Sequence, residues 1–174
     1  YFATFAKSMA GIGAFVSSEK AIIDSLKYNM RSQIFAKSLP MPMVIGALKR
    51  LDILQNEPEH KEKLWEIAKT LQEGLVAEGF NIGNTESPVT PVYVKGNVAE
   101  GTNVVIDLRE NHNIFCSLVA YPVVPKDVLM LRLIPTASHT QKEEDQTIEV
   151  FKKIKANLEA GKYKGDEMQS KSIE

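Results

Sequence analysis

The sequence predicts an α+β fold in which helices cover a small, mostly antiparallel sheet. Two apolar segments, 114–121 and 128–134, have the length and composition of buried strands. The loop between them is too short for a helical crossover, so the two strands are expected to run antiparallel. Apolar residues at helical spacing before and after these strands supply the covering layer.

The first forty residues differ in composition from the rest. Between Tyr1 and Ser18 the only charged side chain is that of Lys7, among small and apolar residues. Gly11 and Gly13 oppose a helix in this stretch. The predicted elements are a short buried strand over 12–16, a helix over 19–27 and a mixed segment over 28–38 that ends in two nearby prolines.

Two helices are predicted in the centre of the chain, over 43–55 and from Asn56 to Gly79. Each carries an apolar stripe on one face, which we interpret as core. Asn56 is the expected N-cap of the second helix, with Glu59 three positions later as its capping-box partner. Gly79 is the expected stop.

The segment after Gly79 carries the expected sheet. Pro91 favours either an edge position or an irregular start for the first strand, because proline cannot donate to a central ladder. Thr140 and Glu143 form the capping box of the last helix. The predicted elements are a strand over 89–95, a helix over 99–111, the two strands named above, and a final helix with Ile148, Phe151, Ile154 and Leu158 on its buried side.

Composition limits the classes of function. The 174 residues suggest one domain, or one domain and a piece of another. Lys+Arg 21 against Asp+Glu 22 gives a net charge of -1, which provides no overall attraction to nucleic acid or an anionic membrane. No uncharged stretch is long enough to span a bilayer. Cys116 is the single cysteine, which excludes an internal disulfide and fits a reducing compartment. The histidines show no metal-ligand spacing, so no metal site is predicted.

Lys7 is the first candidate for chemistry. Most lysines are solvated surface charges, but this one lies in a run of small and apolar residues. Burial would favour the neutral amine, a nucleophile that attacks an aldehyde to form a Schiff base. Thr4 and Ser8 offer hydroxyl groups of the kind that hold a phosphate.

Arg132 is the second candidate. Strand alternation over 128–134 puts Met130, Arg132 and Ile134 on one face. A guanidinium stays charged even when buried, and it pairs with planar anions. Two interpretations follow: a structural arginine, in a salt bridge or at a wet strand end, or a bidentate clamp on a substrate carboxylate.

Residues 4–13, TFAKSMAGIG, resemble at every position the pyridoxal-phosphate (PLP) attachment signature of the α-oxoamine synthases. Further similar segments follow in the family's order: RSQIFAKSLP at 31–40, YPVVP at 121–125, LRL at 131–133 and ASHT at 137–140. The resemblance covers nearly the whole chain. Around 55–60 and 85–88 it is most similar to the bacterial serine palmitoyltransferases, and it extends to 8-amino-7-oxononanoate synthase and 2-amino-3-ketobutyrate CoA ligase.

The resemblance implies the C-terminal portion of a fold-type I PLP enzyme. Residues 1–40 are then expected to be the edge of the large cofactor-binding domain, 41–160 the small domain and 161–174 a frayed tail. The chain opens at Tyr1 without an initiator methionine, so we expect a piece of a longer protein that is inactive alone.

The resemblance also implies an acyltransferase that condenses an amino acid with an acyl-CoA to a 2-amino ketone, with loss of carbon dioxide. Lys7 would hold PLP as a Schiff base, Thr4 would bind its phosphate, and Arg132 would bind the substrate carboxylate. Ser38 would bind the phosphate of the cofactor in the neighbouring subunit. Serine with a long-chain acyl-CoA is the favoured pair; alanine with a pimeloyl thioester and glycine with acetyl-CoA are alternatives. A cytoplasmic homodimer with shared active sites is expected.

Two contrasting classes share this fold. A catalytically silent partner subunit would lack the Schiff-base lysine, whereas Lys7 and its surrounding pattern are intact. A plain aminotransferase would form a keto acid without consuming an acyl-CoA. His139 is expected to be structural, and His60 and His112 exposed.

Overall fold

A computed structural model describes residues 1–165, and the chain forms two compact units, Tyr1–Pro58 and Glu59–Glu174. The division falls at Pro58, whereas the sequence predicts a domain boundary after residue 40; the domain assignment stays a prediction. Of the tail expected to fray, residues 166–174 lie outside the described part. Within the described part of that tail, Tyr163 is 3% exposed and its hydroxyl donates to Asp107 Oδ2 at 2.5 Å.

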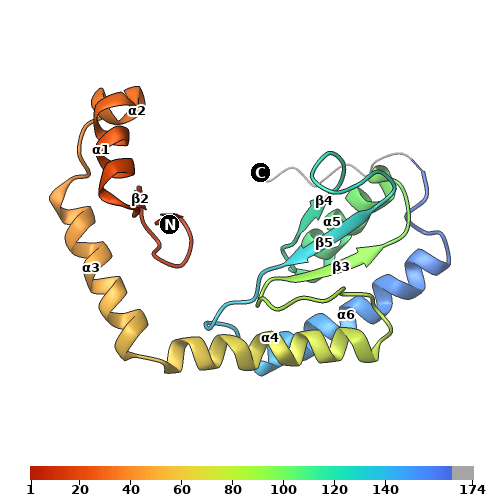
Figure 1. Cartoon of the computed structure of the whole chain (residues 1–174). Helices are drawn as coiled ribbons and strands as arrows, with labels where there is room; N and C mark the ends of the chain where they lie inside the picture. The colour runs from red at the N-terminus through yellow and green to blue at the C-terminus, as the bar shows by residue number, and fades with distance from the viewer. Residues whose placement is uncertain (166–174) are drawn as a thin grey trace, which may run out of the picture. The chain divides into compact units, whose positions relative to one another are not determined.

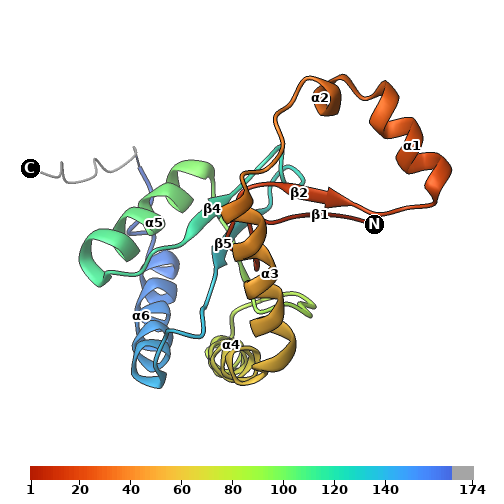
Figure 2. The same ribbon diagram turned by 90° about the vertical axis from the view of Figure 1, so that its left-hand side faces the viewer.

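The first unit opens with an antiparallel hairpin. Strand β1 (Phe2–Thr4) pairs with β2 (Ala14–Val16), and three helices follow: α1 (Lys20–Asn29), α2 (Arg31–Ile34) and α3 (Met41–Asn56) (Figure 1). Figure 2 shows the hairpin leading into α1 and α2. The sequence does not predict β1, since three residues are too few for an alternation pattern.

Two sequence expectations fail in this unit. The strand expected to be buried is exposed, with Phe15 at 47% and Val16 at 44%, because a two-stranded hairpin has no second layer of its own. The apolar stripe of α3, interpreted as core, is also exposed; Leu48 is 62% and Leu54 50% accessible.

The break between α3 and α4 (Glu59–Ala77) also differs from the prediction. Asn56 is the last residue of α3, and its Nδ2 donates back to Asp52 Oδ1 at 2.7 Å, so it does not cap α4. Glu57 takes φ -121 and ψ 73 because Pro58 follows it, and this ends α3. Gly79 follows α4 at φ 76, which confirms the predicted stop.

The second unit contains the predicted sheet. Its order is β3-β5-β4, formed by β3 (Thr90–Val94), β5 (Leu129–Leu133) and β4 (Ser117–Val119), and both pairings are antiparallel (Figure 1). The α+β class, the antiparallel pairing of the last two strands and the edge position of the strand with Pro91 are therefore confirmed. Helices α5 (Val98–His112) and α6 (Gln141–Glu159) complete the unit.

The core of this unit lies between one face of the sheet and the helices. Leu131 and Val92 are fully buried neighbours on β5 and β3, and α4 packs against α6. The predicted face of α6 is confirmed, with Phe151 and Ile154 fully buried. Its capping box is also confirmed, because Glu143 Oε2 accepts from Thr140 N at 2.7 Å. In the part of the chain that the structure describes, we find no helix long and apolar enough to cross a membrane.

Candidate functional site

Lys7 lies in the loop that joins the two strands of the hairpin. Three backbone hydrogen bonds close this loop: Phe5 N donates to Gly13 O at 2.8 Å, Gly11 N to Phe5 O at 2.8 Å, and Ala10 N to Lys7 O at 2.9 Å. Ala10 takes a φ of 42, in the left-handed region that residues other than glycine seldom adopt. The local sequence therefore fixes the backbone that carries the lysine.

The Lys7 side chain is exposed within this chain, contrary to the expectation of burial. Phe5 of the loop stacks on Phe15 of β2 with ring centroids 5.9 Å apart, and the Lys7 side chain lies exposed beside this pair in the sequence. Among residues 1–165 the Lys7 amine has no ion-pair or hydrogen-bond partner. The loop thus presents a free amine.

Thr4 forms the base of the same loop. Its Oγ1 donates to Gly13 O at 3.2 Å and accepts from Ala6 N at 3.2 Å. This places the hydroxyl three residues before Lys7 on a backbone held by its own hydrogen bonds, with its O–H directed at Gly13 O.

The segment with Ser38 reaches the base of the hairpin. Gly13 has φ 109, and a Cβ there would lie 2.9 Å from Leu39 Cδ1. Leu39 therefore packs directly on the glycine, and the exposed Ser38 comes just before it. Arg50 of α3 also lies beside the loop, with Nη1 3.6 Å from where a Gly11 Cβ would be. No sequence signal marked Arg50.

Arg132 lies in the middle of the central strand β5. It faces Pro91 of β3 and Ser117 of β4 in the ladder, and its side chain is exposed while Leu131 and Leu133 are buried on the opposite face. The predicted alternation is confirmed. The described residues give its guanidinium no ion pair or hydrogen bond, so the salt-bridge form of the structural interpretation has no support within this chain.

The structure thus brings Thr4, Lys7 and the Ser38 segment together around one hairpin in the first unit, and it fixes Arg132 on a rigid strand of the second. The first group offers an amine and hydroxyl groups. Arg132 offers a planar cation with unused donors. The roles assigned to these four residues remain predictions.

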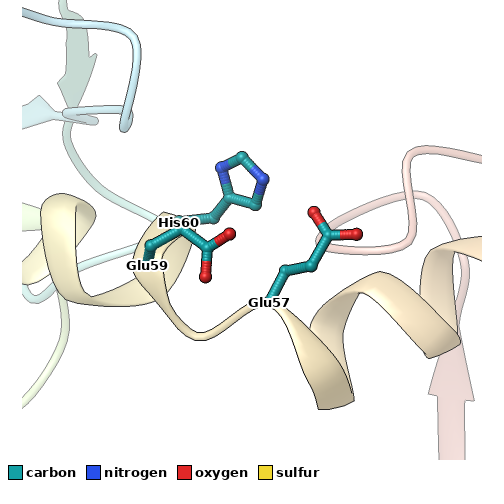
Figure 3. A group of neighbouring side chains, drawn as sticks. All are labelled: Glu57, Glu59 and His60. Atoms are coloured by element: carbon teal, nitrogen blue, oxygen red, sulfur yellow. The ribbon is translucent and has the colours of Figure 1, made fainter.

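Glu57, Glu59 and His60 lie at the junction of α3 and α4 (Figure 3). In the described part of the chain they are the one group of three potential metal ligands, and Glu59 and His60 are exposed. Exposed acidic groups of this kind are common without an ion, so we assign no metal to them.

Comparison with known proteins gives concordant matches. The family model for aminotransferase class I and II matches residues 1–151. A cysteate-C-fatty acyltransferase from Capnocytophaga ochracea is 55% identical over 94% of this chain, and a serine palmitoyltransferase from Sphingobacterium spiritivorum is 35% identical over 87%. The chain covers 39% and 37% of these relatives, less than half of their length.

The fold matches as well. A solved serine palmitoyltransferase with PLP as its internal aldimine superimposes with a TM-score of 0.77 at 26% identity, over 92% of this chain and 40% of that one. PLP is the cofactor of these relatives. The chain therefore belongs to the class I and II aminotransferase family, and within it to the PLP-dependent enzymes of the α-oxoamine synthase type.

Proposed function

We propose that the protein containing this chain is a PLP-dependent acyltransferase that joins an amino acid to a fatty acyl thioester. The proposal rests on the conformation of the hairpin loop between β1 and β2. It presents Lys7 with no partner in the described residues, on a backbone closed by local hydrogen bonds, within a signature matched at every position.

The groups around the hairpin fit PLP chemically. An aldehyde requires an amine, which Lys7 supplies. A phosphate requires donors; Ser38 offers a hydroxyl group, and the Thr4 hydroxyl can donate to a phosphate once it turns away from Gly13 O. Lys7 and Thr4 would hold the cofactor of their own subunit, and Ser38 would reach the phosphate of the cofactor in the neighbouring subunit. When bound, PLP supplies an electron sink that makes the Cα proton of an amino acid removable.

Lys7 and Arg132 have separate tasks in this proposal. The Lys7 Nζ would take the proton from the substrate Cα and later return it. Arg132 binds the α-carboxylate through two parallel N–H donors. Because β5 is hydrogen-bonded to both β3 and β4, the backbone that carries Arg132 is well supported, and the two parallel donors of the guanidinium would orient the carboxylate.

The identity of the amino acid substrate is the most specific part of the proposal. The sequence resemblance favours serine, whereas the higher identity to the relative named for cysteate, 55% against 35%, supports cysteate. We therefore propose cysteate first and serine second, each with a long-chain acyl-CoA. Alanine with a pimeloyl thioester and glycine with acetyl-CoA remain the alternatives. On the resemblance alone we also propose a cytoplasmic homodimer, and a chain of residues 1–174 that is inactive by itself.

The test uses the full polypeptide loaded with PLP. Borohydride reduction and peptide mapping should find the covalent PLP adduct on Lys7, and Lys7→Ala should lose both the adduct and the visible absorbance. CoA release with cysteate, serine, alanine and glycine then ranks the amino donors. An adduct on another residue would refute the site, and keto-acid formation without CoA release would indicate an aminotransferase.

A further inference from the structure

The second unit contains a cavity of about 540 Å³ at the end of β5. Its walls come from α4, the segment after α5, the end of β5 and the first turns of α6. Leu71, Ile114 and Leu133 form much of its apolar side, and His139, Glu144 and Thr147 much of its polar side. The volume is in the range of small-molecule sites.

Glu144 is the unusual member of this wall. It is 3% exposed, and its Oε2 has no hydrogen-bond partner. Its Oε1 lies 3.5 Å from His139 Nδ1, which already accepts from Thr136 N at 3.4 Å. A buried carboxyl oxygen without a partner is rare, because desolvation is not offset by any hydrogen bond.

The helical spacing places Glu144 on the buried face of α6, where an apolar side chain is expected. Glu144 precedes Ile148 by four residues and so continues the buried face of α6, where Phe151 and Ile154 are fully buried. An apolar residue at this position would complete the core. A buried acid at this position, which lines a cavity and whose Oε2 has no hydrogen-bond partner among the described residues, indicates a ligand.

We propose that this cavity binds a guanidinium group, which pairs with Glu144. A guanidinium is planar and weakly hydrated, so it tolerates the apolar walls better than an ammonium does. A metal ion is less suitable, because the acidic and histidine side chains of this cavity do not converge into a ligand set in the described residues. The guanidinium belongs either to a free small molecule or to an arginine side chain.

The test is a calorimetric titration with methylguanidinium chloride at pH 8. It is run on residues 1–174 and on the full PLP-loaded polypeptide. We expect saturable binding with a Kd of ~1–10 mM and a loss of about tenfold or more in Glu144→Gln. Glu149→Gln is the matched control, since Glu149 is exposed on the same helix.

The results show whether the cavity binds a guanidinium group and whether a free molecule or an arginine side chain supplies it. Binding to both proteins supports a free ligand, and binding to residues 1–174 alone supports an arginine side chain of the full polypeptide as the occupant. Absence of saturable binding to both, or unchanged binding in Glu144→Gln, overturns the proposal. Glu144→Met, a second neutral replacement checked by thermal melting, separates loss of the carboxylate from loss of the fold.

Discussion

Replacement of Arg132 by lysine tests the carboxylate clamp with a defined magnitude. The Arg132 side chain is exposed on the face of β5 opposite the core, and it has no partner among the described residues. The change to lysine keeps the charge but removes the paired N–H donors. Losing one charge-assisted hydrogen bond of ~1.5–3 kcal/mol lowers kcat/KM for the amino acid about 10- to 150-fold.

The assay follows CoA release by the full PLP-loaded polypeptide at varied amino acid concentrations. The loss should fall on the amino acid, with the KM of the acyl thioester unchanged. Thermal unfolding should change little, because an exposed side chain without partners contributes within about 0.5 kcal/mol. Arg109→Lys is the control, an exposed arginine of α5 whose Nε lies 2.9 Å from Glu110 Oε1. If Arg132→Lys keeps the wild-type kcat/KM, Arg132 does not bind the carboxylate.

Three further predictions concern stability and reactivity. Tyr163→Phe removes the 2.5 Å hydrogen bond to Asp107 and should lower the free energy of unfolding by ~1.5–3 kcal/mol in urea titrations; an unchanged midpoint would contradict this. Burial raises the pKa of Glu144 from 4.5, so the folded state binds its proton more tightly and loses stability as pH rises through that pKa. Glu144→Gln should therefore gain stability relative to wild type between pH 4 and pH 8 in chemical denaturation, and a constant difference would refute the argument. Burial raises the pKa of the Cys116 thiol to about 11, so iodoacetamide at pH 8 should label it only after unfolding; fast native labelling would show an accessible thiolate.

The second unit could be predicted well from the sequence, because its patterns are long and are satisfied within the unit. The stripe of α6 and the Thr140–Glu143 capping box both occur as expected. The strand predicted over 114–121 is shorter, Ser117–Val119, since apolar composition does not mark where pairing ends. The capping box of Asn97 and Glu100 at α5 was missed, although its asparagine-to-glutamate spacing is a readable signal.

The first unit and the site were harder to predict. Local pattern could not show that Phe5 and Phe15 stack on each other and leave Lys7 uncovered, nor that Asn56 bonds back to Asp52. The orientation of Arg132 followed directly from strand alternation. The sequence does not predict the burial of Glu144. A single charged residue near a helix start is usually solvated, and the burial of this one depends on contacts with residues distant in sequence.

The closed hairpin has a consequence for synthesis of the protein. The hydrogen bonds that shape it join residues at most sixteen positions apart, from Tyr1 to Ser17, and Leu39 packs on it from shortly downstream. Such short-range closure is fast compared with pairing of distant strands. On the ribosome, Lys7 can therefore acquire its backbone geometry while β3, β4 and β5 are still untranslated.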